Sequence, residues 1–189
     1  GGCAMNSVAN GKIYRETSIE KLYVQAAAGD AGGAVGAALI SSQRNDQAFK
    51  RRPIMRADLG PAYTDVQIQS ALTPYLKVFE EQAVLVHHYA DKELFEVVCG
   101  ELIEGGVVGW FQGRMEWGAR ALGNRSILAD PRRADMKDIL NKKIKKRESF
   151  RPFAPSILRE EVAHWFETDD DVPFMSQVFK IKESCREKI

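Results

Sequence analysis

A run of fifteen residues, 112–126, combines three glycines with three arginines. It follows an apolar stretch, 107–111, that is typical of a strand. Glycine lets the backbone approach a ligand closely and adopt positive φ. Each guanidinium presents a planar fork of donors that matches the oxygens of a phosphate. The run therefore indicates a phosphate-binding loop, with an ordinary surface turn as the alternative.

A second basic segment, 145–156, joins a lysine-rich helix to an apolar stretch. Cations in the last turn of a helix interact favourably with the helix dipole, which explains Lys142, Lys143 and Lys146. That reason does not explain an arginine and a serine placed around the apolar stretch 150–155, because a buried arginine needs an anionic partner. We therefore expect this segment to contribute to the same anion site.

Charge is distributed unevenly along the chain. Residues 114–159 carry thirteen Lys and Arg against five Asp and Glu, although the net charge of the whole chain is only +1. A solvated basic helix explains part of this excess. The remainder favours a polyanion such as a nucleoside triphosphate or a nucleic acid as the partner.

Composition indicates a globular protein of one domain or two small ones. The 189 residues are 44% hydrophobic and 28% charged, and no apolar run approaches the length of a membrane span. The N-terminus lacks the features of a signal peptide. The three cysteines are far apart and form no metal-binding pattern, which fits a reducing compartment. We therefore expect a cytoplasmic protein with no membrane partner.

Hydrophobic spacing and turn residues predict helices that alternate with strands, so the fold class is α/β or α+β. The pair Asn10-Gly11 predicts a hairpin within residues 1–14, and residues 19–27 predict a strand or the start of a helix. Asp135 is expected to cap a helix. The other predicted helices are 34–40, 66–72 (capped by Thr64 and Asp65), 91–104 and 160–167, and the other predicted strands are 83–89, 107–111, 126–129 and 153–158. A domain boundary follows residue 89.

Four segments together resemble one enzyme family. Residues 113–132 resemble the signature of the NodU/CmcH O-carbamoyltransferases, which include a tobramycin carbamoyltransferase, and residues 144–156 resemble that family's second signature. Residues 1–6 and 29–39 match upstream in the same order, so the resemblance covers nearly the whole chain. Ala119 stands where many family members have proline.

The resemblance implies both a fold and a reaction. Residues 1–89 would be the C-terminal part of an actin-like ATPase superfold domain with its linker, and residues 90–189 a truncated, YrdC-like open α/β domain. Carbamoyl phosphate and ATP, with Mg²⁺, would give carbamoyl-adenylate, and the carbamoyl group would pass to a hydroxyl-bearing small-molecule acceptor. The chain alone is expected to be inactive.

The resemblance also implies roles for individual residues. Asp30 would be a ligand of iron or another divalent metal, completed by histidines of an HxxxH motif before residue 1; a turn carboxylate is the alternative. Lys145 and Arg147 resemble a Lys-x-Arg phosphate-binding element. The residues expected to carry catalysis are Arg120, Lys145 and Arg147, and those expected to bind ATP or carbamoyl phosphate are Arg114, Arg125, Arg151 and Ser156, with Gly2 and Asn6 on the adenylate.

Two other functions compete with this interpretation. An RNA-binding YrdC-like module would use a basic concave surface, but Trp117, Phe150 and Phe153 do not interleave as a stacking platform would, so we do not expect a nucleic-acid partner. Threonylcarbamoyl-adenylate synthesis is the enzymatic alternative.

Overall fold

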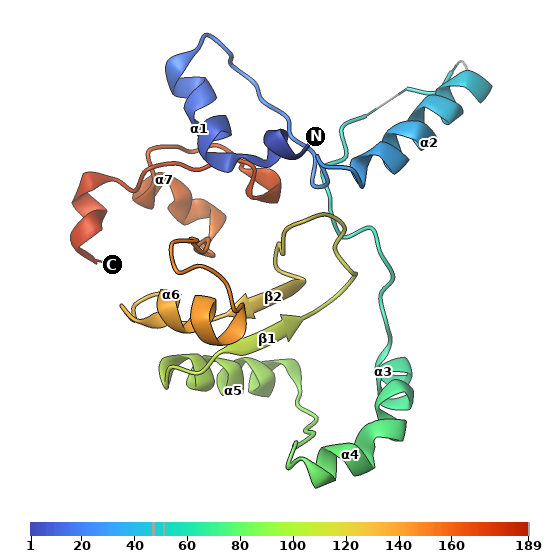
Figure 1. Cartoon of the computed structure of the whole chain (residues 1–189), viewed down its shortest axis with the longest axis vertical. Coiled ribbons are helices and arrows are strands. Elements are labelled where there is room, and N and C mark those ends of the chain that lie inside the picture. The colour runs from blue at the N-terminus through green and yellow to red at the C-terminus, as the bar shows by residue number, and fades with distance from the viewer. Residues whose placement is uncertain (47, 51, 189) are drawn as a thin grey trace.

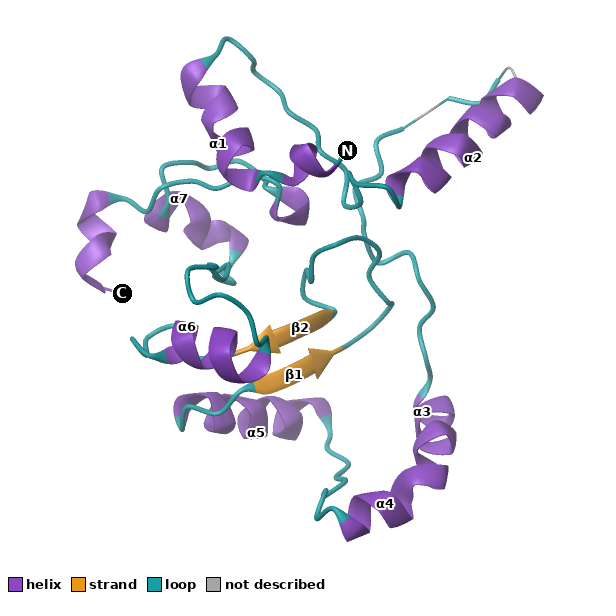
Figure 2. Ribbon diagram, in the orientation of Figure 1, coloured by secondary structure: helices purple, strands orange, loops and turns teal. Residues whose placement is uncertain are grey.

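A two-stranded antiparallel sheet lies near the middle of the chain's fold. The computed structural model describes residues 1–46, 48–50 and 52–188 (Figure 1). Strand β1 (Val108–Phe111) pairs with β2 (Arg125–Leu128) so that Val108 faces Leu128 and Phe111 faces Arg125. Both strands were predicted from the sequence to within one residue, and Figure 2 shows the long loop 112–124 that joins them.

Helix α5 (Asp91–Ile103) packs against β1. The rings of Phe95 and Trp110 connect the two elements, with centroids 6.3 Å apart. Asp91 and Glu93 lie in the first turn, where carboxylates complement the helix dipole. The helix gives way to a turn at Gly105, whose φ of 87° is one that glycine adopts without steric cost. The predicted helix 91–104 is thus confirmed.

Helices α2 (Gly32–Asn45), α3 (Asp65–Leu72) and α4 (Leu76–Glu81) project away from the sheet in Figure 1. Thr64 caps α3 as predicted. Its hydroxyl accepts the backbone N–H of Gln67, and the side chain of Gln67 accepts the N–H of Thr64 in return. The predicted helices 34–40 and 66–72 are confirmed. They could be predicted because the residues that favour them lie within or next to each helix.

The predicted hairpin at Asn10-Gly11 is wrong, because both residues lie inside helix α1 (Ser7–Glu16). The amide of Asn10 is buried and donates to the carbonyl oxygens of Ala4 and Ser176, at 2.8 and 2.9 Å. A Cβ atom at position 11 would lie 2.1 Å from the carbonyl oxygen of Val178. Glycine is therefore required by close packing against the C-terminal segment, and this tertiary contact overrides the local turn preference.

Two predicted strands and one ambiguous segment do not form regular structure. Residues 84–89 form neither helix nor strand, and the side chain of Leu85 is 78% exposed. Residues 153–158 and 19–27 likewise form neither helix nor strand. Apolar, β-branched composition favours a strand only where a neighbouring strand accepts its backbone hydrogen bonds. The fold is therefore a mixture of helices and one small sheet, which agrees with α/β at that coarse level.

The C-terminal part begins with helix α6 (Met136–Ile139), which continues into a π-helical turn (Leu140–Ile144). Asp135 precedes α6, as expected, but makes no capping hydrogen bond because its carboxylate binds the guanidinium of Arg133 at 2.9 Å. The N-cap position is thus as predicted, but the capping hydrogen bond of the side chain is absent. A 3₁₀ turn (Arg159–Glu161) and helix α7 (Val162–Trp165) confirm the helix predicted at 160–167.

The chain ends in two further 3₁₀ turns (Pro173–Met175 and Glu183–Lys188). None of the helices in the described ranges is both long and apolar enough to cross a membrane.

A buried carboxylate at the end of β2 makes stability depend on pH. Asp130 accepts the side-chain Nε and Nη2 and the backbone N–H of Arg132, and these bonds lower the pKa of Asp130 from 3.8 to about 2. A carboxyl group whose pKa is depressed on folding stabilises the fold above its unfolded pKa and loses that effect as the pH falls through the folded pKa.

We expect the thermal midpoint of the wild-type protein to fall between about pH 4 and pH 2. The Asp130→Asn variant should lose less over the same interval, because an amide does not titrate. Melting curves at pH 7, 4 and 2.5 test this, and equal acid sensitivity of the two proteins would contradict the assignment.

Candidate active site in a glycine/arginine loop and a lysine/arginine turn

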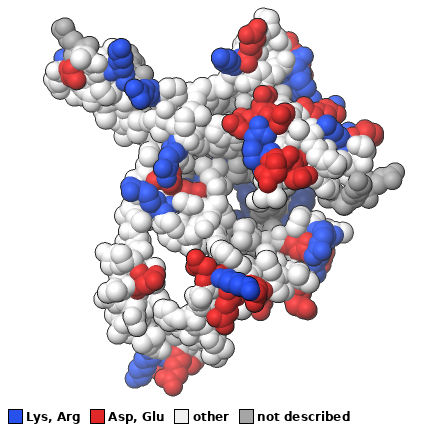
Figure 3. Space-filling view, turned by 180° about the vertical axis from the view of Figure 1, so that it is seen from behind, with Lys and Arg blue, Asp and Glu red and all other residues white. Residues whose placement is uncertain are grey.

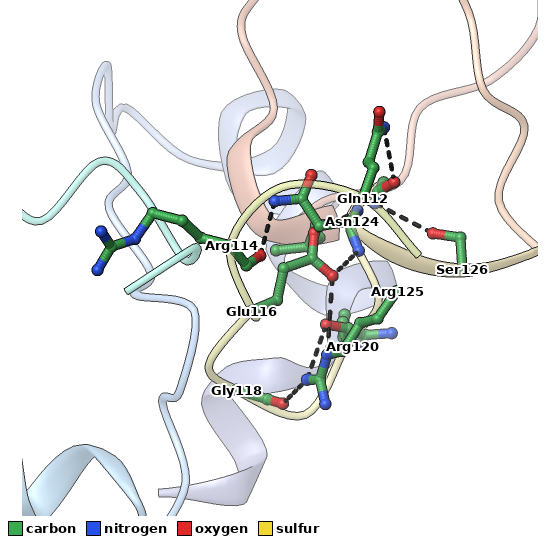
Figure 4. Close-up of polar contacts among 10 residues, drawn as sticks. Gln112, Arg114, Glu116, Gly118, Arg120, Asn124, Arg125 and Ser126 are labelled. Atoms are coloured by element: carbon green, nitrogen blue, oxygen red, sulfur yellow. Dashed lines mark hydrogen bonds and ion pairs between the residues drawn. The ribbon is translucent and has the colours of Figure 1, made fainter. Parts of the chain in front are cut away.

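A buried carboxylate organises the glycine/arginine loop, residues 112–124. Glu116 is 8% exposed, and its two oxygens accept the backbone N–H groups of Leu122 (2.9 Å) and Asn124 (3.1 Å) (Figure 4). The Nε of Arg125 lies 3.7 Å from the same carboxylate. Hydrogen bonds from backbone N–H groups to a charged acceptor are stronger than those to a neutral acceptor. Glu116 therefore fixes residues 122–124, the part of the loop that leads into β2.

Further hydrogen bonds join the two limbs of the loop (Figure 4). The amide of Asn124 donates to the carbonyl oxygen of Arg114 at 2.8 Å, and that of Gln112 donates to the carbonyl oxygen of Gly123 at 3.1 Å. Arg125 donates across the loop to the carbonyl oxygen of Gly118. The loop is therefore braced by its own side chains.

The N-terminal half of the chain holds the outside of the loop. Arg120 donates to the carbonyl oxygen of Met5 (2.8 Å), and Arg114 donates to those of Asp58 (3.1 Å) and Leu59 (3.2 Å). A Cβ at Gly118, where φ is 119°, would lie 2.6 Å from the carbonyl oxygen of Ala26. Close approach and positive φ thus both require glycine at this position.

A pocket of about 490 Å³ lies between the loop and the N-terminal segment. Asp30 and Arg125 both line it, so two of the predicted site residues share one cavity. The other lining residues are Met5, Ala27, Gly29 and Ala31 from the N-terminal segment and Glu116, Trp117, Gly118 and Ala119 from the loop.

The predicted adenylate contacts lie at the N-terminus, close to this pocket. Gly2 begins a 3₁₀ turn (Gly2–Met5), and the last residue of that turn binds Arg120. The side chain of Asn6 is engaged as the N-cap of α1, where it accepts the N–H of Ala9 at 3.1 Å. A ligand bond from Asn6 would therefore have to compete with this cap.

The lysine/arginine turn, residues 145–151, is a separate cluster. Arg147 is half-buried, with its Nε 2.7 Å from Asn141 Oδ1 and its guanidinium carbon 4.8 Å from the ring centroid of Phe153. Arg151 pairs with Glu148 at 2.9 Å on the surface, and Lys145 is exposed. Ser156 is also exposed, on the unpaired stretch 153–158. No hydrogen bond or ion pair between described residues connects this turn to the glycine/arginine loop.

The basic excess is partly neutralised by neighbouring carboxylates. Six of the thirteen cations in 114–159 have a carboxylate partner, namely Arg125, Arg132, Arg133, Lys142, Arg151 and Arg159. Arg114, Arg120 and Arg147 instead donate only to uncharged oxygen atoms of the described chain. On the face drawn in Figure 3, positive and negative side chains are interspersed and form no continuous basic surface. The cations of this segment without an ion pair to a described side chain are therefore these three arginines and Lys137, Lys143, Lys145 and Lys146.

Asp30 supplies one exposed carboxylate to the pocket, a ligand type that suits a hard divalent cation. Both oxygens of the nearby Glu116 are already used by backbone N–H groups. In the described part of the chain, no three His, Cys, Asp or Glu residues are arranged to hold a metal ion. These residues alone do not make a complete metal site, and the metal role of Asp30 stays a prediction.

Sequence reasoning did not identify Glu116 or Asn141. Glu116 had a recognisable signal, since it is the one acidic residue in the run 112–126. Asn141 lies within a lysine-rich helix and had no such signal. Both side chains are buried and bind backbone or arginine atoms.

Replacing Glu116 by alanine should destabilise the fold, because two partly buried backbone N–H groups lose their acceptor, at up to about 1–3 kcal/mol each. Urea unfolding measures the loss. Glu104→Ala is the matched control, since Glu104 is exposed and forms no ion pair with a described side chain. Equal unfolding midpoints for the two variants would show that the loop does not need this carboxylate.

Comparison with known proteins gives the family. The family model described as Carbamoyltransferase C-terminus matches residues 99–189, and the model described as Carbamoyltransferase N-terminus matches residues 1–39. Asp30 lies in the segment matched by the N-terminus model, and Arg120 and Arg147 lie in the segment matched by the C-terminus model. The pocket beside the glycine/arginine loop is therefore lined by residues from both matched segments.

Curated relatives agree with these matches. A Synechocystis protein, sll1178, is 47% identical over 98% of this chain and 30% of its own length. Nodulation protein NolNO of Sinorhizobium fredii is 41% identical over 98% of the chain and 27% of its own length. A 3'-hydroxymethylcephem-O-carbamoyltransferase of Amycolatopsis lactamdurans is 30% identical over 97% of the chain and 32% of its own length. The chain spans about a third of the length of these relatives. The resemblance seen in the sequence is thus confirmed, and the chain belongs to the NodU/CmcH-like carbamoyltransferase family.

Proposed function

We propose that this chain carries the ATP- and carbamoyl phosphate-binding part of an O-carbamoyltransferase. The observation that carries the proposal is the set of arginines, Arg114, Arg120 and Arg147, that lie on two family signature segments and form no ion pair with a described carboxylate. A cation held by uncharged oxygen atoms keeps its full charge for an incoming anion.

The proposed reaction has two stages. Carbamoyl phosphate loses phosphate to water, and an oxygen of the resulting carbamate attacks the α-phosphorus of ATP, so that pyrophosphate leaves and carbamoyl-adenylate forms. An acceptor hydroxyl then attacks the carbamoyl carbon, loses its proton, and AMP leaves. Neither stage needs a side-chain nucleophile, so the protein acts by positioning the reactants and stabilising charge.

The family signatures support a role for each residue. Arg147 and Lys145 bind the phosphates at the lysine/arginine turn, with Arg151 and Ser156 beside them. Arg114, Arg120 and Arg125 act from the glycine/arginine loop, and Gly2 and Asn6 contact the adenylate. Mg²⁺, when bound, neutralises triphosphate charge, and Asp30 contributes one ligand to a second divalent metal, iron or another. We also propose that residues 90–189 belong to a YrdC-like domain and residues 1–89 to an actin-like one.

A small anion is favoured over RNA as the partner. On the face drawn in Figure 3 the charges are interspersed, whereas a nucleic-acid backbone binds a continuous basic surface. An acceptor with a free hydroxyl fits the Amycolatopsis relative, which is named for carbamoyl transfer to a hydroxymethylcephem.

Replacing Arg147 by alanine in the full-length protein should reduce carbamoyl phosphate-dependent release of pyrophosphate from ATP roughly a hundred-fold or more. Arg147→Lys should rescue only part of the loss, because an ammonium group cannot form a bidentate pair with phosphate. Lys137→Ala is the control, since Lys137 lies on α6 and makes no ion pair with a described side chain. Melting curves recorded beside the assay separate lost chemistry from lost folding, and near-normal pyrophosphate release from Arg147→Ala would refute the assignment.

A further inference from the structure

Asn141 is the polar side chain most completely removed from solvent among those described, with an exposure of 0%. Burying an amide is unfavourable unless its donors and acceptors find partners. Every partner of this amide belongs to the lysine/arginine turn. Its oxygen accepts the Nε of Arg147 at 2.7 Å, and its nitrogen donates to the carbonyl oxygens of Arg151 (2.9 Å) and Ser149 (3.3 Å).

The backbone around Asn141 has two unusual features. Residues Leu140–Ile144 form a π-helical turn, closed by a hydrogen bond from the N–H of Lys145 to the carbonyl oxygen of Leu140 at 2.8 Å. Lys146 then adopts a φ of 48°, in the left-handed region that a lysine rarely occupies. Such features persist where surrounding contacts impose them, and they cluster at functional sites. Here the backbone oxygen of Asn141 accepts the N–H of Arg147 at 3.0 Å, so Asn141 itself closes the turn.

The contacts of Arg147 leave its two terminal amino groups available. Asn141 occupies Nε, the ring of Phe153 covers the guanidinium at 4.8 Å, and neither Nη atom has a hydrogen-bond partner among the described residues. The guanidinium is thus fixed on one edge and one face. The remaining edge, which carries the Nη groups, is the part that would bind an anion.

The choice of asparagine is also informative. An aspartate at position 141 would accept the same Nε bond, but it would cancel the charge of Arg147 and lose both donors to the turn. A leucine of similar size would make none of these bonds. Asparagine holds the guanidinium and the turn together and, being neutral, adds no negative charge beside Arg147.

We propose that Asn141 is a positioning residue that orients Arg147 toward the phosphate of the substrate. This inference rests on the proposed function, because it assumes that Arg147 binds a phosphate in adenylate formation. It does not require Asn141 to touch the substrate.

The deciding variant is Asn141→Asp in the full-length protein, because it preserves volume and the acceptor for Nε. We expect kcat/KM for carbamoyl phosphate-dependent pyrophosphate release to fall on the order of ten- to a hundred-fold. Affinity for inorganic pyrophosphate, measured by calorimetry, should weaken as well. The melting temperature should also fall, because the turn loses two donors, while the circular dichroism spectrum stays that of a folded protein. Asn45→Asp, the same change at an exposed helix end, should leave both unchanged.

A double-mutant cycle separates positioning from a general structural role. In an Arg147→Ala background, Asn141→Asp should cause no further loss of rate, since the group that it positions is gone. Additive losses would overturn the inference, and so would an Asn141→Asp protein that fails to fold by circular dichroism, because the amide would then serve the fold itself. Wild-type protein that binds pyrophosphate but shows no carbamoyl phosphate dependence would instead refute the proposed function.

Discussion

The buried carboxylate of Glu116 is the interaction on which the glycine/arginine loop depends. A charge that is only 8% exposed must be compensated, and here two backbone N–H groups and Arg125 do so. Because these bonds lie inside the loop, its backbone stays in one conformation while the side chains of Arg114 and Arg120 extend outward. The arginines can then reach carbonyl oxygens of the N-terminal half and still keep their charge.

The same principle recurs elsewhere in the molecule. Asn10, Asp130 and Asn141 are buried polar side chains, and each ties down a distinct segment by hydrogen bonds. By contrast, the buried apolar residues are few, and several large apolar side chains are mostly exposed, among them Val66 (76%) and Phe150 (75%). Directed hydrogen bonds rather than apolar burial therefore define the geometry of the described site.

An element could be predicted from the sequence where the residues that determine it are close together in the chain. Helices α3 and α5 and both strands were predictable because a cap, a glycine stop or an apolar period lies within each element. Asn10-Gly11 was misassigned because its partners are distant, at Ser176 and Val178. The stretches 83–89 and 153–158 have strand-like composition but meet no partner strand.

The candidate site shows the same division. Arg120 and Arg147 were identifiable by residue type and by resemblance to a family signature. Glu116 and Asn141 were missed, since the role of a buried polar residue depends on what surrounds it. The separation of the glycine/arginine loop from the lysine/arginine turn could not be read from residue types either.

The attachment of the loop to the N-terminus also has a consequence for folding kinetics. Arg120 and Met5 are 115 positions apart in the chain, and Asn10 and Ser176 are 166 apart. Contacts between residues so far apart in the sequence must overcome a large loop-closure entropy. We therefore expect them to form after the local helices and the β1–β2 hairpin. The pocket between the two matched segments is therefore among the last parts of the chain to assemble, and changes there should accelerate unfolding more than they slow folding.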